Sequence, residues 1–222
     1  MSNLSSIGKK LVMSVSGLFL VLFLLFHMSM NLVAVFSGEA YNAVCEFLGT
    51  NWYALIGTAV LALGAIVHII YAFILTMQNR KARGVERYSN QATPKTVEWA
   101  SQNMLILGII VCLGLVLHLS HFWYKMMFAE LVGATNQFAP TDGAAWIQFY
   151  FSKPLIVVLY LIWFVAIWFH LSHGFWSAIQ TIGWNNKIWM DRWRCISNIV
   201  TTVIFLGFAS VVIITYIKSL CC

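Results

Sequence analysis

The chain has 222 residues, of which 61% are hydrophobic and only 9% are charged. A soluble domain of this length has no way to bury so much apolar surface, so the composition excludes an ordinary soluble protein and indicates a membrane protein. The net charge of +6 is gathered in a few loops and does not indicate a nucleic-acid partner. The five cysteines form no CxxC or CxxCH pattern, so neither a zinc ribbon nor a covalently attached c-type haem is indicated.

Five long apolar runs follow one another along the chain, and each is long enough to cross a bilayer as a helix. They cover roughly residues 11–36, 53–77, 103–124, 155–182 and 197–217. The first run is longer than the apolar core of a signal peptide, so we expect a retained span. Aromatic residues at the edges fit an interfacial belt, and Pro154 fits the first turn of the fourth helix. We therefore predict an all-α integral membrane protein: one domain over residues 1–222, built as a bundle of five transmembrane helices.

Positive charges are distributed unequally between the two sides of this bundle. Ten lie at the N-terminus and in the second and fourth loops: Lys9, Lys10, Arg80, Lys81, Arg83, Arg87, Lys95, Lys187, Arg192 and Arg194. Three lie on the other side: Lys125, Lys153 and Lys218. We expect a multi-pass protein of a bacterial cytoplasmic membrane, and for such a protein the positive-inside rule predicts an N-terminus in the cytoplasm and a C-terminus outside. The basic face has two interpretations, contact with anionic lipid headgroups or a docking surface for soluble subunits.

All six histidines lie within the predicted spans: His27, His68, His118, His121, His170 and His173. An ionisable side chain is costly inside a bilayer, so such residues usually face the bundle interior and serve a function. A single buried histidine is equally well explained by a hydrogen bond to a backbone carbonyl. Six histidines, with at least one in each of the first four spans, favour a functional site.

Depth along the helices sorts four of these histidines into two levels. At 1.5 Å per residue, His27 lies about 18 Å from the outer edge of its span and His118 about 10 Å from the same side. His68 and His170 lie about 18 and 20 Å from the inner edge. Because neutral imidazole is a good ligand for haem iron, two histidine pairs stacked across the membrane predict an electron-transfer path.

The third and fourth spans each contain an HxxH pair, which places two imidazoles about 60° apart on one face of an α-helix. From spacing alone, His121 and His173 remain alternatives to His118 and His170. HxxH boxes also occur in membrane di-iron enzymes, but those enzymes gather a larger histidine set at one membrane face. Here the six histidines lie at two depths.

Three local motifs surround the histidines: His27 followed by Asn31; Gly108 ten residues before His118; and His170-Leu-Ser-His-Gly-Phe-Trp-Ser177 followed by Gly183. In these motifs, and in span count, orientation and histidine order over the whole chain, the sequence resembles the di-haem cytochrome b membrane-anchor subunit of succinate:quinone oxidoreductases. This family includes succinate dehydrogenases and fumarate reductases. The third motif looks like the family's His-x3-Gly-x-Trp-Ser, and the first like its His-x3-Asn.

The resemblance implies a bundle that encloses two b haems. Their axial ligands would be His27 with His118 on the outer haem and His68 with His170 on the inner haem. The fifth helix would pack at the periphery. The resemblance does not settle the role of His121 and His173. They could contact haem propionates or a quinone, or they could simply pack against their neighbours. Four polar residues near inner helix ends could bond to propionates or to the backbone: Ser14, Ser16, Ser101 and Gln180.

The resemblance also implies that the chain carries electrons between an iron–sulfur subunit and a membrane quinone, with menaquinone expected. A flavoprotein subunit would handle succinate and fumarate, and the resemblance admits a dimer of such heterotrimers. The sequence has no phosphate loop, flavin fingerprint or cysteine cluster, so the quinone reaction is the only chemistry expected here. Glu46, in the first outer loop, is the candidate proton acceptor at the quinone site, with a solvated loop acid as the alternative.

Two other functions stay open at this point. One is the di-haem cytochrome b subunit of another quinone-linked enzyme, such as a formate dehydrogenase, hydrogenase or nitrate reductase. One ligand in each of four consecutive spans favours the succinate family instead. The other is a transporter with a histidine relay, although the sequence shows none of the inverted repeats with broken helices that are common in transporters.

Overall fold

The computed structural model describes residues 4–83 and 99–221, with only the backbone described at residues 50 and 83. Every regular element within these ranges is a helix. Five helical segments are long and apolar enough to cross a membrane: Ser6–Phe36, Trp52–Ala82, Met104–Val132, Pro154–Thr181 and Trp189–Cys221. The all-α class and the five predicted spans are therefore confirmed, and the chain is a multi-pass membrane protein.

The helices in chain order are α1 (Ser6–Phe36), α2 (Gly38–Thr50), α3 (Trp52–Arg83), α4 (Trp99–Gln102), α5 (Met104–His118), the π-helix η1 (Leu119–Phe128), α6 (Ala129–Val132), α7 (Gly143–Phe151), α8 (Pro154–Thr181) and α9 (Trp189–Cys221). The predicted spans were too short at several ends. The third continues to Val132 instead of ending near residue 124, and the fifth begins at Trp189 instead of near residue 197. Hydropathy detects only the apolar core of a helix, whereas the backbone stays helical through the polar turns at each end.

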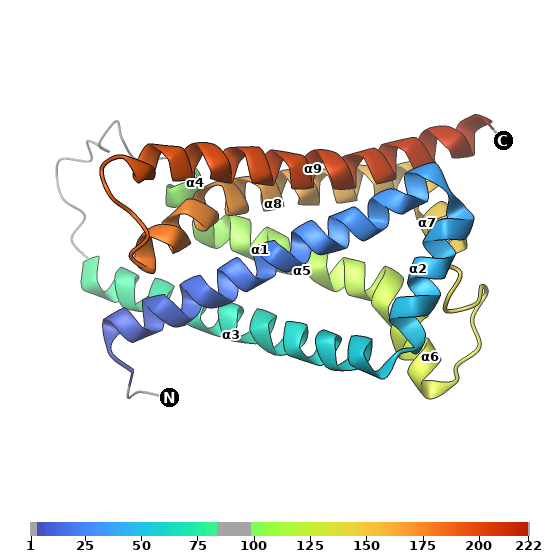
Figure 1. The fold of residues 1–222 in the computed structure, drawn as a ribbon, viewed down its shortest axis with the longest axis horizontal. Helices are drawn as coiled ribbons and strands as arrows, with labels where there is room; N and C mark the ends of the chain where they lie inside the picture. The colour runs from blue at the N-terminus through green and yellow to red at the C-terminus, as the bar shows by residue number, and fades with distance from the viewer. Residues whose placement is uncertain (1–3, 84–98, 222) are drawn as a thin grey trace.

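The long helices lie roughly side by side, with α1 crossing the bundle diagonally between α3 on one side and α9 on the other (Figure 1). The start of α1 and the end of α9 lie at opposite ends of the bundle, as five crossings require. Among the described residues, the backbone of α1 packs closely against α3, α8 and α9, and that of α8 packs against α5 and α9. The core therefore gathers around α1 and α8, which carry two of the four candidate ligands.

The fifth span is more than a peripheral helix, contrary to the expectation from the sequence. Ser197 and Thr201 of α9 are each only 1% exposed. The Ser197 hydroxyl donates to the carbonyl of Ser172 at 3.1 Å, and Trp168 donates to Thr202 at 3.0 Å. Small polar side chains at a helix interface allow close approach and hydrogen bonding inside a bilayer. These contacts hold the N-terminal half of α9 against the C-terminal half of α8.

Two short helices, α2 and α7, were not predicted and lie at one end of the bundle (Figure 1), which is called the outer end here after the orientation that the charges predict. Each starts at a side-chain cap, since Ser37 accepts from the Ala40 amide and Asp142 from the Ala145 amide, both at 3.1 Å. Asn42 joins the two helices by donating to Asp142 and accepting from the Ala144 amide, both at 2.8 Å. The pair forms a fixed cover over the outer ends of the spans.

The third span changes its winding immediately after His118. Residues 104–118 are α-helical, residues 119–128 form the π-helix η1, and residues 129–132 return to an α-helix. A π-helix bonds i to i+5 and turns less per residue than an α-helix, and such segments are frequent at functional sites. His118 and His121 are consequently separated by a wider angle than the 60° expected for an α-helix.

The ends of α8 explain two residues that were singled out in the sequence, Pro154 and Gly183. Pro154 occupies the first turn, as predicted, where its missing N–H is least costly. Gly183 follows the last turn with φ at +88°, a left-handed conformation that favours glycine. The glycine thirteen residues after His170 therefore ends this helix and starts the turn toward α9.

Candidate functional site

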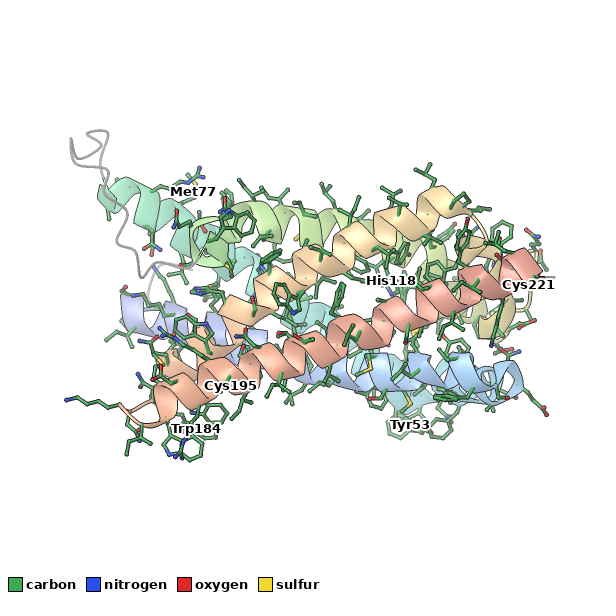
Figure 2. All side chains as sticks on the ribbon, turned by 90° about the horizontal axis from the view of Figure 1, so that it is seen from above. Tyr53, Met77, His118, Trp184, Cys195 and Cys221 are labelled. Carbon is green, nitrogen blue, oxygen red and sulfur yellow. The ribbon has the colours of Figure 1, made fainter. Side chains whose placement is uncertain are left out.

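The side chains of His27 and His118 meet in the outer half of the bundle. His27 lies on α1 and His118 on the last turn of α5, and their ring centres are 5.8 Å apart with planes at 82°. In Figure 2, His118 lies in the interior, between the end marked by Trp184 and Cys195 and the end marked by Cys221. The structure thus brings together the two residues that were predicted to form the outer pair.

Aromatic rings surround this outer pair. Phe23, one turn before His27, stacks on it with ring centres 5.2 Å apart, and Phe208 of α9 approaches to 5.8 Å. Trp163 of α8 lies 5.7 Å from the His118 ring. This packing restricts the rotation of both imidazoles.

The inner pair joins His68 of α3 to His170 of α8. Their ring centres are 6.4 Å apart, and the planes meet at 79°. The two histidine pairs therefore span from α1 to α5 and from α3 to α8. The side-chain partners agree with the depth argument and with the pairing that the family resemblance implied. Their role as metal ligands remains a prediction.

The hydrogen bonding of His68 determines which of its ring nitrogens is available to a ligand. Its Nδ1 lies 3.3 Å from the backbone carbonyl of Met13. A carbonyl only accepts, so Nδ1 carries the proton and Nε2 presents a lone pair. Histidines that bind metals commonly donate their other N–H to a carbonyl in this way, which fixes the tautomer and the ring orientation.

Two further features of the inner pair suit a bound group. The buried Nδ1 of His170 has no hydrogen-bond partner in the described part of the chain. A buried polar atom without a partner is costly and calls for an explanation such as a bound ligand or water. The second feature is the close approach of Gly17, since a β-carbon there would lie 3.2 Å from the His68 ring. A β-carbon at Gly108 would make only an ordinary contact with His170, at 3.7 Å.

The spacing within each pair suits one metal ion between two imidazoles. Ring centres bound to one metal lie about 6 Å apart, since a metal–nitrogen bond is about 2 Å and the ring centre lies about 1 Å behind the nitrogen. The observed 5.8 and 6.4 Å bracket this value. Among residues 4–83 and 99–221, no three His, Cys, Asp or Glu side chains gather around a common point. The larger ligand set of a di-iron centre is therefore not assembled in these segments.

The second histidine of each HxxH pair lies in a different environment. His121 stacks on Tyr150 of α7 at 4.2 Å, and its Nδ1 is 3.2 Å from the hydroxyl of Tyr160, which is 1% exposed. His173 packs edge-on against Trp176 at 4.9 Å. Both histidines have neighbours of their own, and neither takes part in the two pairs described above.

The remaining predicted site residues are placed as follows. Glu46 lies on α2 with an exposed side chain, so the region expected to be an outer loop is a helix. The buried Ser16 donates to the Met13 carbonyl at 3.0 Å and lies 3.4 Å from His68 Nδ1. Ser16 thus bonds back to the backbone, as one of the two alternatives predicted. Ser14 is buried nearby, and Gln180 is exposed at the end of α8.

Sequence reasoning missed one contributor to this site. Tyr41 of α2 donates a hydrogen bond to Oδ1 of Asn31 at 3.0 Å, and Nδ2 of Asn31 lies 3.4 Å from Nε2 of His27. Asn31 was noted only as part of the His-x3-Asn motif. Tyr41 could not be found from spacing, because its place depends on how α2 folds over the bundle.

Together these features define a class of protein: an all-helical, multi-pass membrane protein with two interior histidine pairs at different depths. The chain is 27% identical to the succinate dehydrogenase cytochrome b558 subunit of Bacillus subtilis (strain 168) over 192 residues, which is 86% of this chain and 85% of that protein. No family model and no solved structure matches. The similarity confirms the resemblance to succinate dehydrogenase cytochrome b subunits that the histidine motifs indicated.

Proposed function

We propose that this chain is the membrane-anchor and electron-transfer subunit of a succinate:quinone oxidoreductase. The similarity to a succinate dehydrogenase cytochrome subunit over most of both chains supports a subunit of such an oxidoreductase complex. The electron-transfer role rests on the two histidine contacts, each of which has the spacing that suits one metal ion. Each of the four long helices α1, α3, α5 and α8 supplies one of these histidines.

The residues that would hold two b haems are His27 with His118 on the outer side and His68 with His170 on the inner side. Haem held in this way supplies one-electron redox centres at two depths of the membrane. The chain itself contributes the orientation of these histidines. Met13 fixes the tautomer of His68, and Phe23 and Trp163 restrict the outer pair.

The quinone, for which we propose menaquinone, would react toward the outer side of the bundle. Glu46 is our candidate for the group that takes up the proton there, because its exposed carboxylate on α2 can exchange protons with the outside medium. Oxidation of a quinol releases protons with its electrons, so an acceptor of this kind is required near the site.

The basic inner end is our candidate docking face for an iron–sulfur subunit, which in turn would contact a flavoprotein subunit. Described cations at this end are Lys9, Lys10, Arg80, Lys81, Lys187, Arg192 and Arg194. The Arg83 side chain, Arg87 and Lys95 belong to the same predicted face but lie outside the described residues. The orientation with this face in the cytoplasm, and a dimer of heterotrimers, are parts of the proposal.

A reduced-minus-oxidised visible spectrum of the purified chain tests this function. We expect the α-band of b-type haem at two haems per chain, together with reduction by a quinol. A colourless protein, prepared from cells that supply haem, would refute the proposal. One haem per chain would retain the cytochrome but contradict the assignment of two pairs.

A further inference from the structure

A chain of hydrogen bonds leads from the outer cover of the bundle to the outer histidine pair. The Tyr41 hydroxyl donates to Asn31 Oδ1 at 3.0 Å. The amide nitrogen of Asn31 donates to the backbone carbonyl of His27 at 2.8 Å and lies 3.4 and 3.5 Å from the two ring nitrogens of His27. One side chain therefore contacts both the backbone and the imidazole of a candidate ligand.

The first residue of this chain is held firmly in place. Tyr41 is 7% exposed and belongs to the buried core. Its ring packs against the backbone of Gly143 at the start of α7, where a β-carbon would lie 2.7 Å from Tyr41 Cε1. Because Asn42 hydrogen-bonds α2 to α7, the position of the Tyr41 hydroxyl is set by the folded outer cover as a unit.

We propose that Tyr41 and Asn31 are positioning residues that orient His27 and raise the reduction potential of the outer redox centre. Through these two residues, the folded pair of helices α2 and α7 influences that centre. The inference rests on the proposed function, because it concerns a haem bound by His27 and His118. It assigns a role to a residue outside the spans that no histidine motif includes.

The direction of the effect follows from charge. The N–H groups of the Asn31 amide carry partial positive charge and lie beside the His27 ring. They therefore stabilise the reduced state of the centre, which raises its reduction potential. The hydrogen bond from Tyr41 polarises the amide further and stops it from rotating. Burial raises the pKa of the Tyr41 phenol well above its ordinary value, so this hydroxyl remains a donor across the physiological pH range.

The test is a redox titration of the full-length, haem-containing chain, followed through the haem α-band. Tyr41→Phe removes one oxygen atom, and Asn31→Leu removes the amide at similar volume. Tyr216→Phe is the matched control, because Tyr216 is a half-buried tyrosine that packs on the same core from α9. The outer centre is identified by repeating the titration with His170→Ala, which leaves only the outer pair intact.

We expect the outer midpoint potential to fall in both variants, more in Asn31→Leu than in Tyr41→Phe, with the inner potential and the control unchanged. An unmoved outer potential, or an equal shift of both centres, would overturn the inference. If Asn31→Leu does not fold, Tyr41→Phe alone gives the answer, because its packing is preserved. An unmodified chain without haem would refute the proposed function, whereas two haems with an unmoved outer potential would refute this inference alone.

Discussion

At the scale of single residues, the bonding of each histidine separates candidate ligands from packing residues. His68 uses Nδ1 for the Met13 carbonyl and keeps Nε2 for a partner. His121 instead uses Nδ1 for Tyr160 and its ring face for Tyr150. The two imidazoles are chemically identical, so their different roles come from the neighbours that the fold supplies.

The His170-Leu-Ser-His173 segment offers a direct test of this distinction. His170→Ala should lower the haem content from two to one per chain, because His68 then has no partner across the inner site. His173→Ala should keep both haems, since His173 packs on Trp176 and is not part of the inner pair. Pyridine haemochrome analysis of both purified variants measures the content. Loss of haem from His173→Ala alone would show that the assignment of the ligand is wrong.

Gly17 provides a steric test of the inner pair. A side chain at this position would press on the His68 ring, because even its β-carbon would lie 3.2 Å from Cε1. Gly17→Val should displace the imidazole and destabilise the haem-bound fold by about 1–3 kcal/mol, the usual cost of overpacking. Gly57→Val is the control, since a β-carbon at Gly57 meets no atom within 4 Å. The inner haem should be lost selectively, and equal losses of haem in the two variants would contradict this reasoning.

At the scale of elements, the glycine at the start of α7 allows the outer cover to close. A β-carbon at Gly143 would collide with Cys45 Sγ and would lie 2.7 Å from Tyr41 Cε1. The two helices can approach this closely only because that residue has no side chain. The hydrogen bonds of Asn42 then keep the helices in register.

Substitution at Gly143 should therefore loosen α2 from α7. We expect Gly143→Ala to reduce stability by about 1–3 kcal/mol through overpacking. Gly49→Ala, on the same helix as Tyr41 but with nothing within 4 Å of its β-carbon, should be neutral or stabilising by up to about 1 kcal/mol from helix propensity. The thermal midpoints of the two variants in detergent give the comparison. A Gly143→Ala midpoint at or above that of Gly49→Ala would contradict this account.

Hydropathy was sufficient to predict the five spans, because long apolar runs have few other solutions in a bilayer. It did not predict α2 or α7, since α2 is of mixed polarity and α7, although apolar, is too short to read as a span. Each helix also depends on a cap, Ser37 or Asp142. Hydropathy also did not predict the π-helix after His118, because i to i+5 bonding leaves no distinct hydrophobic period. Depth along a helix is set by a fixed rise per residue, so it placed the histidines at two levels. The choice of His118 over His121 and of His170 over His173 came from the family resemblance, because depth cannot separate two histidines on neighbouring turns.

At the scale of the whole molecule, the two ends of the bundle differ in charge and in covering. One end carries most of the described cations, including Lys10, Arg80 and Arg194. The opposite end is closed by α2 and α7, and there Lys218 of α9 donates to the Val35 carbonyl of α1 at 3.1 Å. This asymmetry is what the positive-inside rule uses, and it predicts that the basic end faces the cytoplasm.

The native cysteines can report this orientation. Cys195 is exposed near the basic end and Cys221 is exposed near the C-terminus, at opposite ends of α9 (Figure 2). In single-cysteine variants, a membrane-impermeant maleimide added to right-side-out vesicles should label Cys221 and spare Cys195. Inverted vesicles should give the reverse.

Cys45 supplies the internal control for the same experiment. Burial raises the pKa of its thiol to about 11, and the reactive form of cysteine is the thiolate. At pH 7 the thiolate fraction is therefore very small, and it increases only as the pH approaches that value. A variant that retains only Cys45 should stay unlabelled at neutral pH from either side and become reactive in alkaline medium or after denaturation. Labelling of Cys195 from outside intact cells would reverse the proposed orientation, and would place the basic face away from the compartment where an iron–sulfur subunit could dock.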